Sequence, residues 1–128
     1  MRVLLDTHSF LWAITDPDKM SPQALEILSN KSNQVFLSVA SGWEIAIKSK
    51  LGKLSLPINI ESYILKQIAI AAIDVLPIQM SHALHVYKLP LHHQDPFDRI
   101  IIAQSQLENL PIVTGDSTIA RYPVRTLW

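Results

Sequence analysis

The sequence predicts an α/β fold in which helices cover both faces of a parallel sheet of four to five strands. Short apolar segments alternate with segments of helical character along the 128 residues, an order typical of chains that build parallel sheets. Apolar runs such as Val3-Leu4-Leu5 lack strict alternation, which suits strands buried on both faces. The length fits one domain over residues 1–128.

The first half of the chain contains two of the predicted strands. Ser21 and Ser41 are the expected N-caps of two helices, and Gly52 is well placed just after the end of the second. In chain order the predicted elements are a strand at 2–6, a short helix at 9–14, a helix from Pro22 to about Leu28, a strand at 34–39, a helix from Ser41 to Leu51, and a helix from about Asn59 to about Ala71.

The second half supplies the remaining strands. Asp95-Pro96 opens a helix whose apolar stripe is Phe97, Ile100, Ile101 and Leu107, and this stripe is expected in the core. The predicted elements are a strand at 73–78, a helix at 81–88 ended by Pro90, the helix after Asp95, a strand at 111–114, a short helix at 117–121 and a fifth strand at 124–127.

The amino-acid composition disfavours several classes of function and metal site. Eleven acidic and eleven basic residues balance to zero net charge, which counts against a module that binds nucleic acid by bulk electrostatics. No cysteine is present, so thiolate metal sites and disulfides are excluded. The sequence has no long apolar segment, so we expect a cytoplasmic protein without membrane association. Apolar residues make up 48% of the chain, which suggests a surface for a partner.

Four acidic residues fall where this fold brings segments together. Asp6 ends the first strand, and Asp116 follows the fourth across Gly115. Glu44 is expected in the first turn of the helix after the second strand, and Asp98 in the first turn of the helix before the fourth. Because ligands bind beyond the carboxyl ends of parallel strands, we expect these acids to share one edge of the sheet.

Each acid except Asp6 also has a simple structural interpretation. Ser41 and Glu44 fit a capping box, and Glu44 with Lys48 fits an i,i+4 ion pair. Asp98 is favoured near the start of a helix beside the cap Asp95, and Asp116 is a potential cap of the short helix after it. Asp6 is different, because an acid at the end of a buried strand is costly unless something compensates. Mg²⁺ or Mn²⁺, which prefer oxygen ligands, would relieve the repulsion between such carboxylates.

Four motifs occur in order along the chain: Asp6-Thr7-His8, Trp43-Glu44-Ile45-Ala46-Ile47-Lys48, Asp95-Pro96-Phe97-Asp98-Arg99 and Thr114-Gly115-Asp116. Together they resemble the PIN-domain nucleases, and most closely the VapC-type toxins of bacterial toxin–antitoxin pairs. The resemblance extends from Arg2 to Trp128. It implies a sheet in the order 3-2-1-4-5 and a metal-dependent endoribonuclease.

By position, Asp6, Glu44, Asp98 and Asp116 match the acidic residues that hold one or two Mg²⁺ or Mn²⁺ ions in the family. The resemblance also implies an RNA substrate, a small antitoxin encoded alongside, and a homodimer or a toxin–antitoxin hetero-oligomer. An alternative is a module that keeps the fold and binds RNA or a partner without cutting it.

Four further residues are candidates for supporting roles. Thr7 and Thr114 are placed to orient the carboxylates by hydrogen bonds, or they are ordinary residues at strand ends. Lys48 and Arg99 lie beside Glu44 and Asp98 and would contact RNA phosphate or form solvated ion pairs.

Other sites found in α/β proteins are disfavoured. The histidine pairs His82/His85 and His92/His93 do not form a known zinc motif. A phospho-receiver domain requires an aspartate at the end of the third strand, where Pro77-Ile78-Gln79-Met80 stands. A haloacid-type phosphatase requires a second aspartate two residues after the first, where His8 stands.

Overall fold

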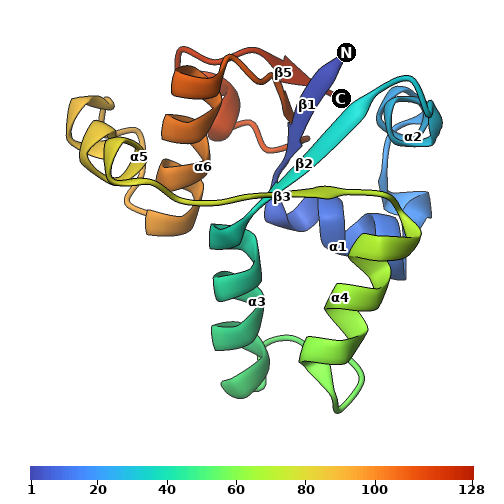
Figure 1. Cartoon of the computed structure of the whole chain (residues 1–128). Coiled ribbons are helices and arrows are strands. Elements are labelled where there is room, and N and C mark those ends of the chain that lie inside the picture. The colour runs from blue at the N-terminus through green and yellow to red at the C-terminus, as the bar shows by residue number, and fades with distance from the viewer.

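A central strand, β1, organises the computed structural model, which describes residues 1–128. The five strands are all parallel and lie in the order β3-β2-β1-β4-β5 (Figure 1). Their bounds are β1 Arg2–Leu5, β2 Gln34–Ser38, β3 Asp74–Leu76, β4 Ile112–Val113 and β5 Thr126–Leu127. The predicted fold class, strand order and parallel sense are confirmed, with the outer strands shorter than expected.

Six α-helices connect and cover the strands. They are α1 Thr7–Thr15, α2 Pro22–Ser29, α3 Val39–Lys50, α4 Ile60–Ile70, α5 Met80–His85 and α6 Pro96–Glu108. Short 3₁₀ turns occupy Pro17–Lys19, Val86–Lys88 and Ile119–Arg121. None of these helices has the length and apolar character needed to span a bilayer.

Local signals in the sequence fix several helix ends as predicted. Ser21 caps α2 by accepting a hydrogen bond from the Ala24 amide, and Asp95 caps α6 by accepting from the amides of Phe97 and Asp98. Gly52 follows the end of α3 with a φ of 76°, a conformation that a glycine adopts without steric cost.

The predicted cap of α3 was wrong. The helix begins at Val39, and its N-cap is Ser38, whose hydroxyl accepts from the Ala40 amide at 3.0 Å. Glu44 therefore lies in the second turn of α3, out of reach of the cap, so the capping-box interpretation of Ser41 and Glu44 no longer holds. The predicted helix 81–88 is likewise divided into α5 and a 3₁₀ turn.

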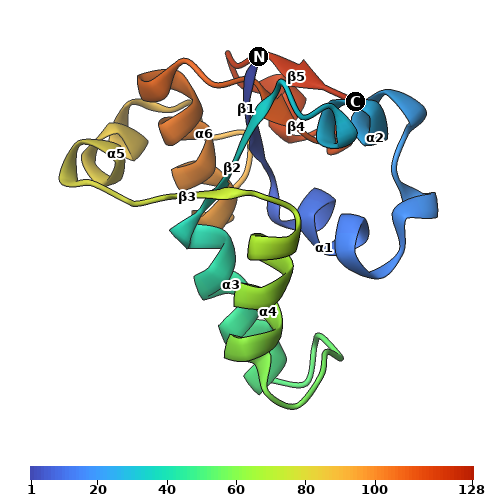
Figure 2. The same cartoon turned by 45° about the vertical axis from the view of Figure 1, so that its right-hand side comes forward.

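The sheet separates two hydrophobic clusters. Val3 and Leu5 of β1 belong to one cluster, which includes side chains of α1, α2 and α4, whereas Leu4 belongs to the other, which includes α6. Successive side chains of a strand point to opposite faces, so β1 is buried on both. Figures 1 and 2 show α1 and α2 on one side of the sheet and α5 and α6 on the other.

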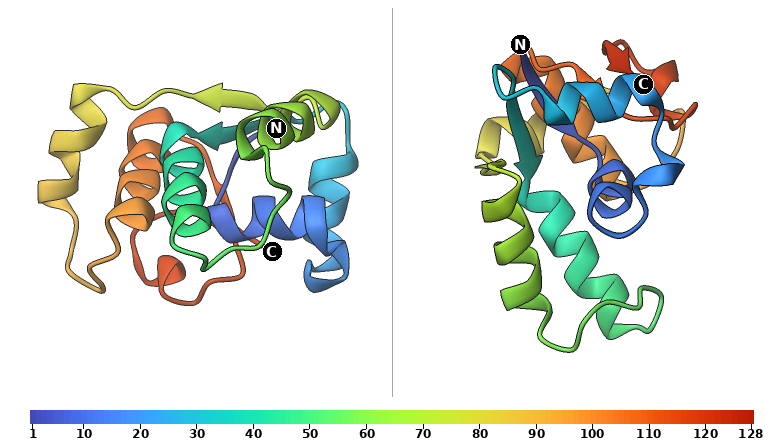
Figure 3. Two further views of the ribbon diagram at one scale, coloured as in Figure 1. Left: turned by 90° about the horizontal axis from the view of Figure 1, so that it is seen from below. Right: turned by 90° about the vertical axis from the view of Figure 1, so that its right-hand side faces the viewer.

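The helices α3 and α4 project from the sheet as an antiparallel pair, joined by the loop at residues 51–59 (Figure 3). Because α3 starts where β2 ends, its N-terminal half lies beside the carboxyl end of β1. This placement brings Glu44 toward the edge where Asp6 follows β1.

Candidate active site

Asp6 is the most deeply buried acid at this edge. It follows β1 directly and caps α1, and only 3% of the residue is exposed. Oδ1 accepts a hydrogen bond from the Ser9 amide at 2.7 Å, and Oδ2 accepts one from the Thr114 hydroxyl at 2.5 Å. Burial raises the pKa of Asp6, and these hydrogen bonds oppose that rise. The carboxylate is thus fixed in place by the start of α1 and the end of β4.

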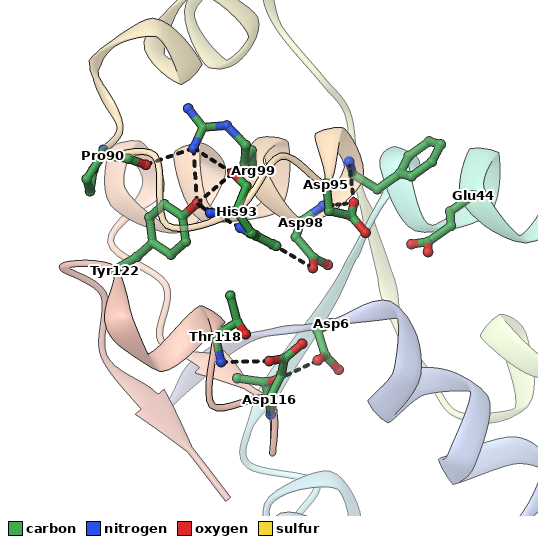
Figure 4. Close-up of polar contacts among 12 residues, drawn as sticks. Asp6, Glu44, Pro90, His93, Asp95, Asp98, Arg99, Asp116, Thr118 and Tyr122 are labelled. Atoms are coloured by element: carbon green, nitrogen blue, oxygen red, sulfur yellow. Dashed lines mark hydrogen bonds and ion pairs between the residues drawn. The ribbon is translucent and has the colours of Figure 1, made fainter.

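Asp116 lies beside Asp6 (Figure 4). Its amide donates to the Thr114 hydroxyl at 3.0 Å, and its Oδ1 accepts from the Thr118 amide at 2.7 Å. A cavity of about 260 Å³ adjoins the two acids and is lined by Asp6, His8, Trp12, Gly115 and Asp116. Asp6 and Asp116 therefore line the same opening of the protein surface, as expected for residues that follow two adjacent parallel strands.

Asp98 lies across from this pair, in the first turn of α6, with its carboxylate directed toward Asp6 and Asp116 (Figure 4). Its Oδ2 lies 3.0 Å from Nε2 of His93. Burial raises the pKa of Asp98 to about 6, with smaller contributions in the same direction from Asp95 and Glu44, while His93 lowers it. A carboxyl group with such a pKa exchanges protons near neutrality.

Glu44 extends from α3 toward the same space and is 2% exposed. Its Oε2 pairs with the ammonium group of Lys48 one turn later, while its Oε1 is buried and has no hydrogen-bond partner. An unpartnered buried carboxylate oxygen is costly. This oxygen is therefore a free donor atom for a cation.

The four acids face a common space, but each is held by a different protein donor. Thr114 and Ser9 hold Asp6, Thr118 holds Asp116, His93 holds Asp98, and Lys48 holds Glu44. No three carboxylate or imidazole groups lie close enough together to form a finished metal site. Carboxylates repel one another where no cation lies between them, and the convergence of the four acids on a shared ion stays a prediction.

The acids nevertheless fit a hard divalent cation. All offer carboxylate oxygens, which Mg²⁺ and Mn²⁺ prefer, and Glu44 Oε1 lacks a partner within the protein. A bound cation would also offset the burial that raises the pKa values of Asp6 and Asp98. No cysteine is present, and His93 already has partners on both ring nitrogens.

Of the residues predicted to support the acids, Thr114 and Lys48 contact one of the four acids and Thr7 does not. Thr114 donates to Asp6, as described above, whereas the Thr7 hydroxyl donates to Ser41 at 2.9 Å and joins α1 to α3 instead of orienting a carboxylate. Lys48 pairs with Glu44, and this interaction raises the pKa of Lys48. Lys48 also lines a hollow of about 220 Å³ together with Glu44 and Lys53.

The interpretation of Arg99 as a phosphate contact or a solvated ion pair was wrong. The residue is 7% exposed, and its guanidinium donates to the carbonyl oxygens of Pro90 at 2.8 Å and Val86 at 3.2 Å and to the Tyr122 hydroxyl at 3.0 Å. All these partners are neutral. Arg99 therefore ties the loop before α6 to the C-terminal segment.

Two residues at the site were missed from the sequence. His93 was considered only as a zinc ligand, and Tyr122 was not considered at all, yet the two hydrogen-bond to each other and His93 pairs with Asp98. The only signal in the sequence is that His93 lies five residues before Asp98. The contribution of Tyr122 depends on tertiary packing.

Comparisons with known proteins agree with this fold. The family model of the PIN domain matches residues 3–124. A comparison with curated protein sequences gave no significant match. A chain of the structure of VapBC2 from Rickettsia felis bound to a DNA fragment from its promoter has a TM-score of 0.75 and 16% identity, over 99% of this chain and 98% of that one.

Two further solved structures are similar. A chain of FitAcB from Neisseria gonorrhoeae has a TM-score of 0.62 and 19% identity, over 100% of this chain and 97% of that one. A chain of VapBC-5 from Mycobacterium tuberculosis, a member of the VapBC family of toxin–antitoxin systems, has a TM-score of 0.59 and 18% identity, over 94% and 89%. At these identities the likeness shows the fold, and the family model, which spans nearly all residues, shows that the chain belongs to the PIN domain family.

Proposed function

We propose that this protein is an endoribonuclease that depends on Mg²⁺ or Mn²⁺ and acts as the toxin of a toxin–antitoxin pair. The observation that carries the proposal is the edge of the sheet where Asp6, Glu44, Asp98 and Asp116 face one space. Two of these carboxyl groups have raised pKa values and a third has an unpartnered buried oxygen. Membership of the PIN domain family supports nuclease activity.

Each acid has a role in this proposal. A bound divalent ion supplies an acidified water molecule and offsets the charge that develops on the scissile phosphate. Asp6 and Asp116, which lie side by side, would hold the ion directly. Asp98 and Glu44 would bind it directly or through water, or accept the proton of the attacking water. The pKa of Asp98, about 6 without metal, suits such proton transfer near neutrality.

Basic residues beside the acids would contact the RNA backbone. Lys48 and Lys53 line the hollow that Glu44 also lines, so their ammonium groups lie where a phosphate would approach the carboxylates. Phosphate contacts position a nucleic acid without reading its sequence. This arrangement supports RNA binding despite zero net charge, because two basic residues lie at the edge of the proposed site.

The proposed antitoxin would bind an apolar hollow that none of the four acids lines. This hollow, of about 350 Å³, is formed between α1, α2 and α4, and eight of its ten lining residues are hydrophobic, among them Ile14, Leu25 and Ile70. An amphipathic segment with its apolar face in such a groove is a common mode of recognition. The similar VapBC-5 structure is a member of a toxin–antitoxin family, which supports a partner of this kind.

Self-association, as a homodimer or within a hetero-oligomer with the antitoxin, also belongs to the proposal. Trp43 is 60% exposed and Met80, Leu84 and Leu91 are more exposed still. Large exposed apolar side chains are typical of interfaces. Sedimentation of the purified chain, alone and with the antitoxin, measures the state.

A cleavage assay tests the enzyme. Purified protein is incubated with mixed tRNA, rRNA and mRNA, with Mg²⁺, with Mn²⁺ or with EDTA. We expect cleavage that requires the metal and falls by at least 100-fold in Asp98→Asn. Asp18→Asn, which changes an exposed acid of the Pro17–Lys19 turn, is the matched control and should cleave like the wild type. Undiminished cleavage by Asp98→Asn would contradict the proposal.

The same samples separate an enzyme from a binding module. RNA that is retained by the wild type but never cut, whatever the metal, would support the non-catalytic alternative. For the toxin role, the wild type should arrest bacterial growth when expressed alone, and co-expression of the protein encoded beside it should restore growth. Growth unaffected by the wild type would contradict the toxin role.

A further inference from the structure

We propose that His93 is a positioning residue that orients Asp98 for the metal site, and that Tyr122 and Arg99 hold the His93 ring in the tautomer this requires. The inference rests on the proposed function, since it assigns the residues that prepare one of the proposed metal ligands. It is carried by a continuous chain of hydrogen bonds from Arg99 through Tyr122 and His93 to Asp98 (Figure 4).

The ring of His93 is held at both nitrogens. Nδ1 lies 2.7 Å from the Tyr122 hydroxyl oxygen, and Nε2 lies 3.0 Å from Oδ2 of Asp98. The rings of His93 and Tyr122 also pack edge to face, with centroids 5.4 Å apart. A neutral imidazole donates from one nitrogen and accepts at the other, so the direction of one hydrogen bond determines the direction of the other.

The Tyr122 hydroxyl determines that direction. Its oxygen already receives two N–H donors, one from Arg99 Nη1 at 3.0 Å and one from the His93 amide at 3.3 Å. A hydrogen on Nδ1 of His93 would be a third donor toward the same oxygen, which has two lone pairs. The hydroxyl hydrogen is therefore directed to Nδ1, the nearest acceptor, because the His93 carbonyl oxygen is farther away at 3.4 Å.

Arg99 keeps the Tyr122 hydroxyl hydrogen directed toward His93. A guanidinium group cannot lose its proton in a protein and has no acceptor, so its contact with Tyr122 is always a donation. The group is buried and bonded to the carbonyl oxygens of Pro90 and Val86, which hold it in place. The orientation of the Tyr122 hydroxyl is thus set by a residue one position after Asp98.

The orientation of the Tyr122 hydroxyl determines the hydrogen bond that His93 makes to Asp98. With Nδ1 accepting, Nε2 of His93 carries the hydrogen and donates to Oδ2 of Asp98. This hydrogen bond favours the ionised carboxylate, against the larger opposing effect of burial on its pKa. It also leaves Oδ1 of Asp98 without a protein donor, and the carboxylate is directed toward Asp6 and Asp116. Carboxylates that bind metals are commonly oriented in this way by their neighbours.

The first test measures the tautomer in metal-free protein. Long-range ¹H–¹⁵N NMR spectra of ¹⁵N-labelled wild type at pH 8, with His93 assigned by comparison with His93→Gln, should show the hydrogen on Nε2. At this pH the ionised Asp98 only accepts hydrogen bonds, so the effect of Tyr122 is measured in Asp98→Asn, whose amide can donate or accept. Asp98→Asn should keep the hydrogen on Nε2, and adding Tyr122→Phe, which removes only the hydroxyl, should abolish this preference; thermal melting shows whether the variants are folded. A wild-type ring with its hydrogen on Nδ1, or the same hydrogen position in Asp98→Asn with and without Tyr122→Phe, would overturn the inference.

The second test measures Mn²⁺ affinity by calorimetry. His93→Ala should weaken binding roughly 10–100-fold, as loss of such partners typically does, and His93→Gln, which keeps an N–H donor, should recover most of it. His85→Ala is the control, because His85, at the end of α5, pairs with Gln106 in the last turn of α6 and contacts none of the four acids. Equal affinities in His93→Ala and His85→Ala would overturn the positioning role. Failure of the wild type to bind Mn²⁺ would instead overturn the proposed function, and the NMR result would still decide the ring orientation.

Discussion

The Thr114 hydroxyl donates a hydrogen bond of 2.5 Å to Oδ2 of Asp6, a residue 108 positions earlier in the chain. We predict that Thr114→Val, which keeps the shape of the side chain, lowers the free energy of unfolding by roughly 1–3 kcal/mol, because a buried carboxylate oxygen loses its donor. Urea unfolding measures the change. Thr126→Val, at a half-buried threonine whose hydroxyl makes no hydrogen bond within the protein, should change stability by less than about 0.5 kcal/mol. Equal losses in both variants would contradict the role of this hydrogen bond.

The raised pKa of Asp98 predicts how stability depends on pH in metal-free protein. Burial raises this pKa from 3.8 to about 6, so between about pH 4 and pH 6 the folded chain holds a proton that the unfolded chain has released. The free energy of unfolding therefore falls as the pH rises through this window, by roughly 1–3 kcal/mol. Urea unfolding in EDTA between pH 4 and pH 7 measures the slope.

Asp98→Asn should make that slope shallower, while Asp6, whose pKa burial also raises, should leave part of it. Asp18→Asn should retain the slope of the wild type. Parallel pH curves for wild type and Asp98→Asn would show that Asp98 does not hold a proton in the folded state at these pH values.

The pairing of Lys48 with the buried Glu44 predicts a link between stability and metal. Lys48→Met should lower the free energy of unfolding by roughly 1–3 kcal/mol, because Glu44 keeps a buried charge without its partner. Mn²⁺ should then raise the Tm of Lys48→Met more than that of the wild type, since the freed carboxylate gains a cation. Lys50→Met, at an exposed position of the same helix, serves as control. A smaller Mn²⁺ shift in Lys48→Met would count against Glu44 as a ligand.

The buried guanidinium of Arg99 predicts that lysine cannot replace it. Arg99→Lys should destabilise the fold by roughly 1.5–3 kcal/mol, because one ammonium cannot reach the oxygens of Val86, Pro90 and Tyr122 together. Arg121→Lys, the same change at an exposed residue, should be nearly neutral. Thermal and urea unfolding measure both, and equal effects would contradict the assignment of Arg99 to the interior.

Two glycines predict opposite effects of the same substitution. A Cβ atom at Gly115 would lie 2.7 Å from Cε2 of Trp128, whereas one at Gly42 would meet nothing within 4 Å. Gly115→Ala should therefore cost roughly 1–3 kcal/mol by overpacking, while Gly42→Ala in α3 should stabilise by about 0.5–1 kcal/mol. Thermal melting measures the pair, and an unchanged Tm in Gly115→Ala would mean that Trp128 moves aside freely.

The fold was predictable because its signals are local. Apolar runs mark the strands, and caps such as Ser21 and Asp95 mark helix starts through bonds within three residues. The cap of α3 was misassigned because two serines stand three residues apart at the end of β2. Ser38 was taken as part of the strand, and the buried contact between Ser41 and Thr7 depends on a helix 34 residues earlier.

The candidate site was predictable only in part. Asp6 and Asp116 follow adjacent parallel strands, so topology alone places them together. The pairing of Asp98 with His93 and the burial of Arg99 against Tyr122 depend on how the loop before α6 packs on the C-terminal segment. No periodicity or spacing carries that information, since the two segments are more than twenty residues apart.

The placement of β4 beside β1 has a consequence during synthesis on the ribosome. Asp6 is translated 108 residues before Thr114, and Asp116 and Tyr122 follow later still. The acids therefore cannot assemble on a growing chain until the segment that contains Thr114 and Asp116 has left the exit tunnel. The time needed to translate these intervening residues passes before the site can form, so any partner translated in that interval can fold first.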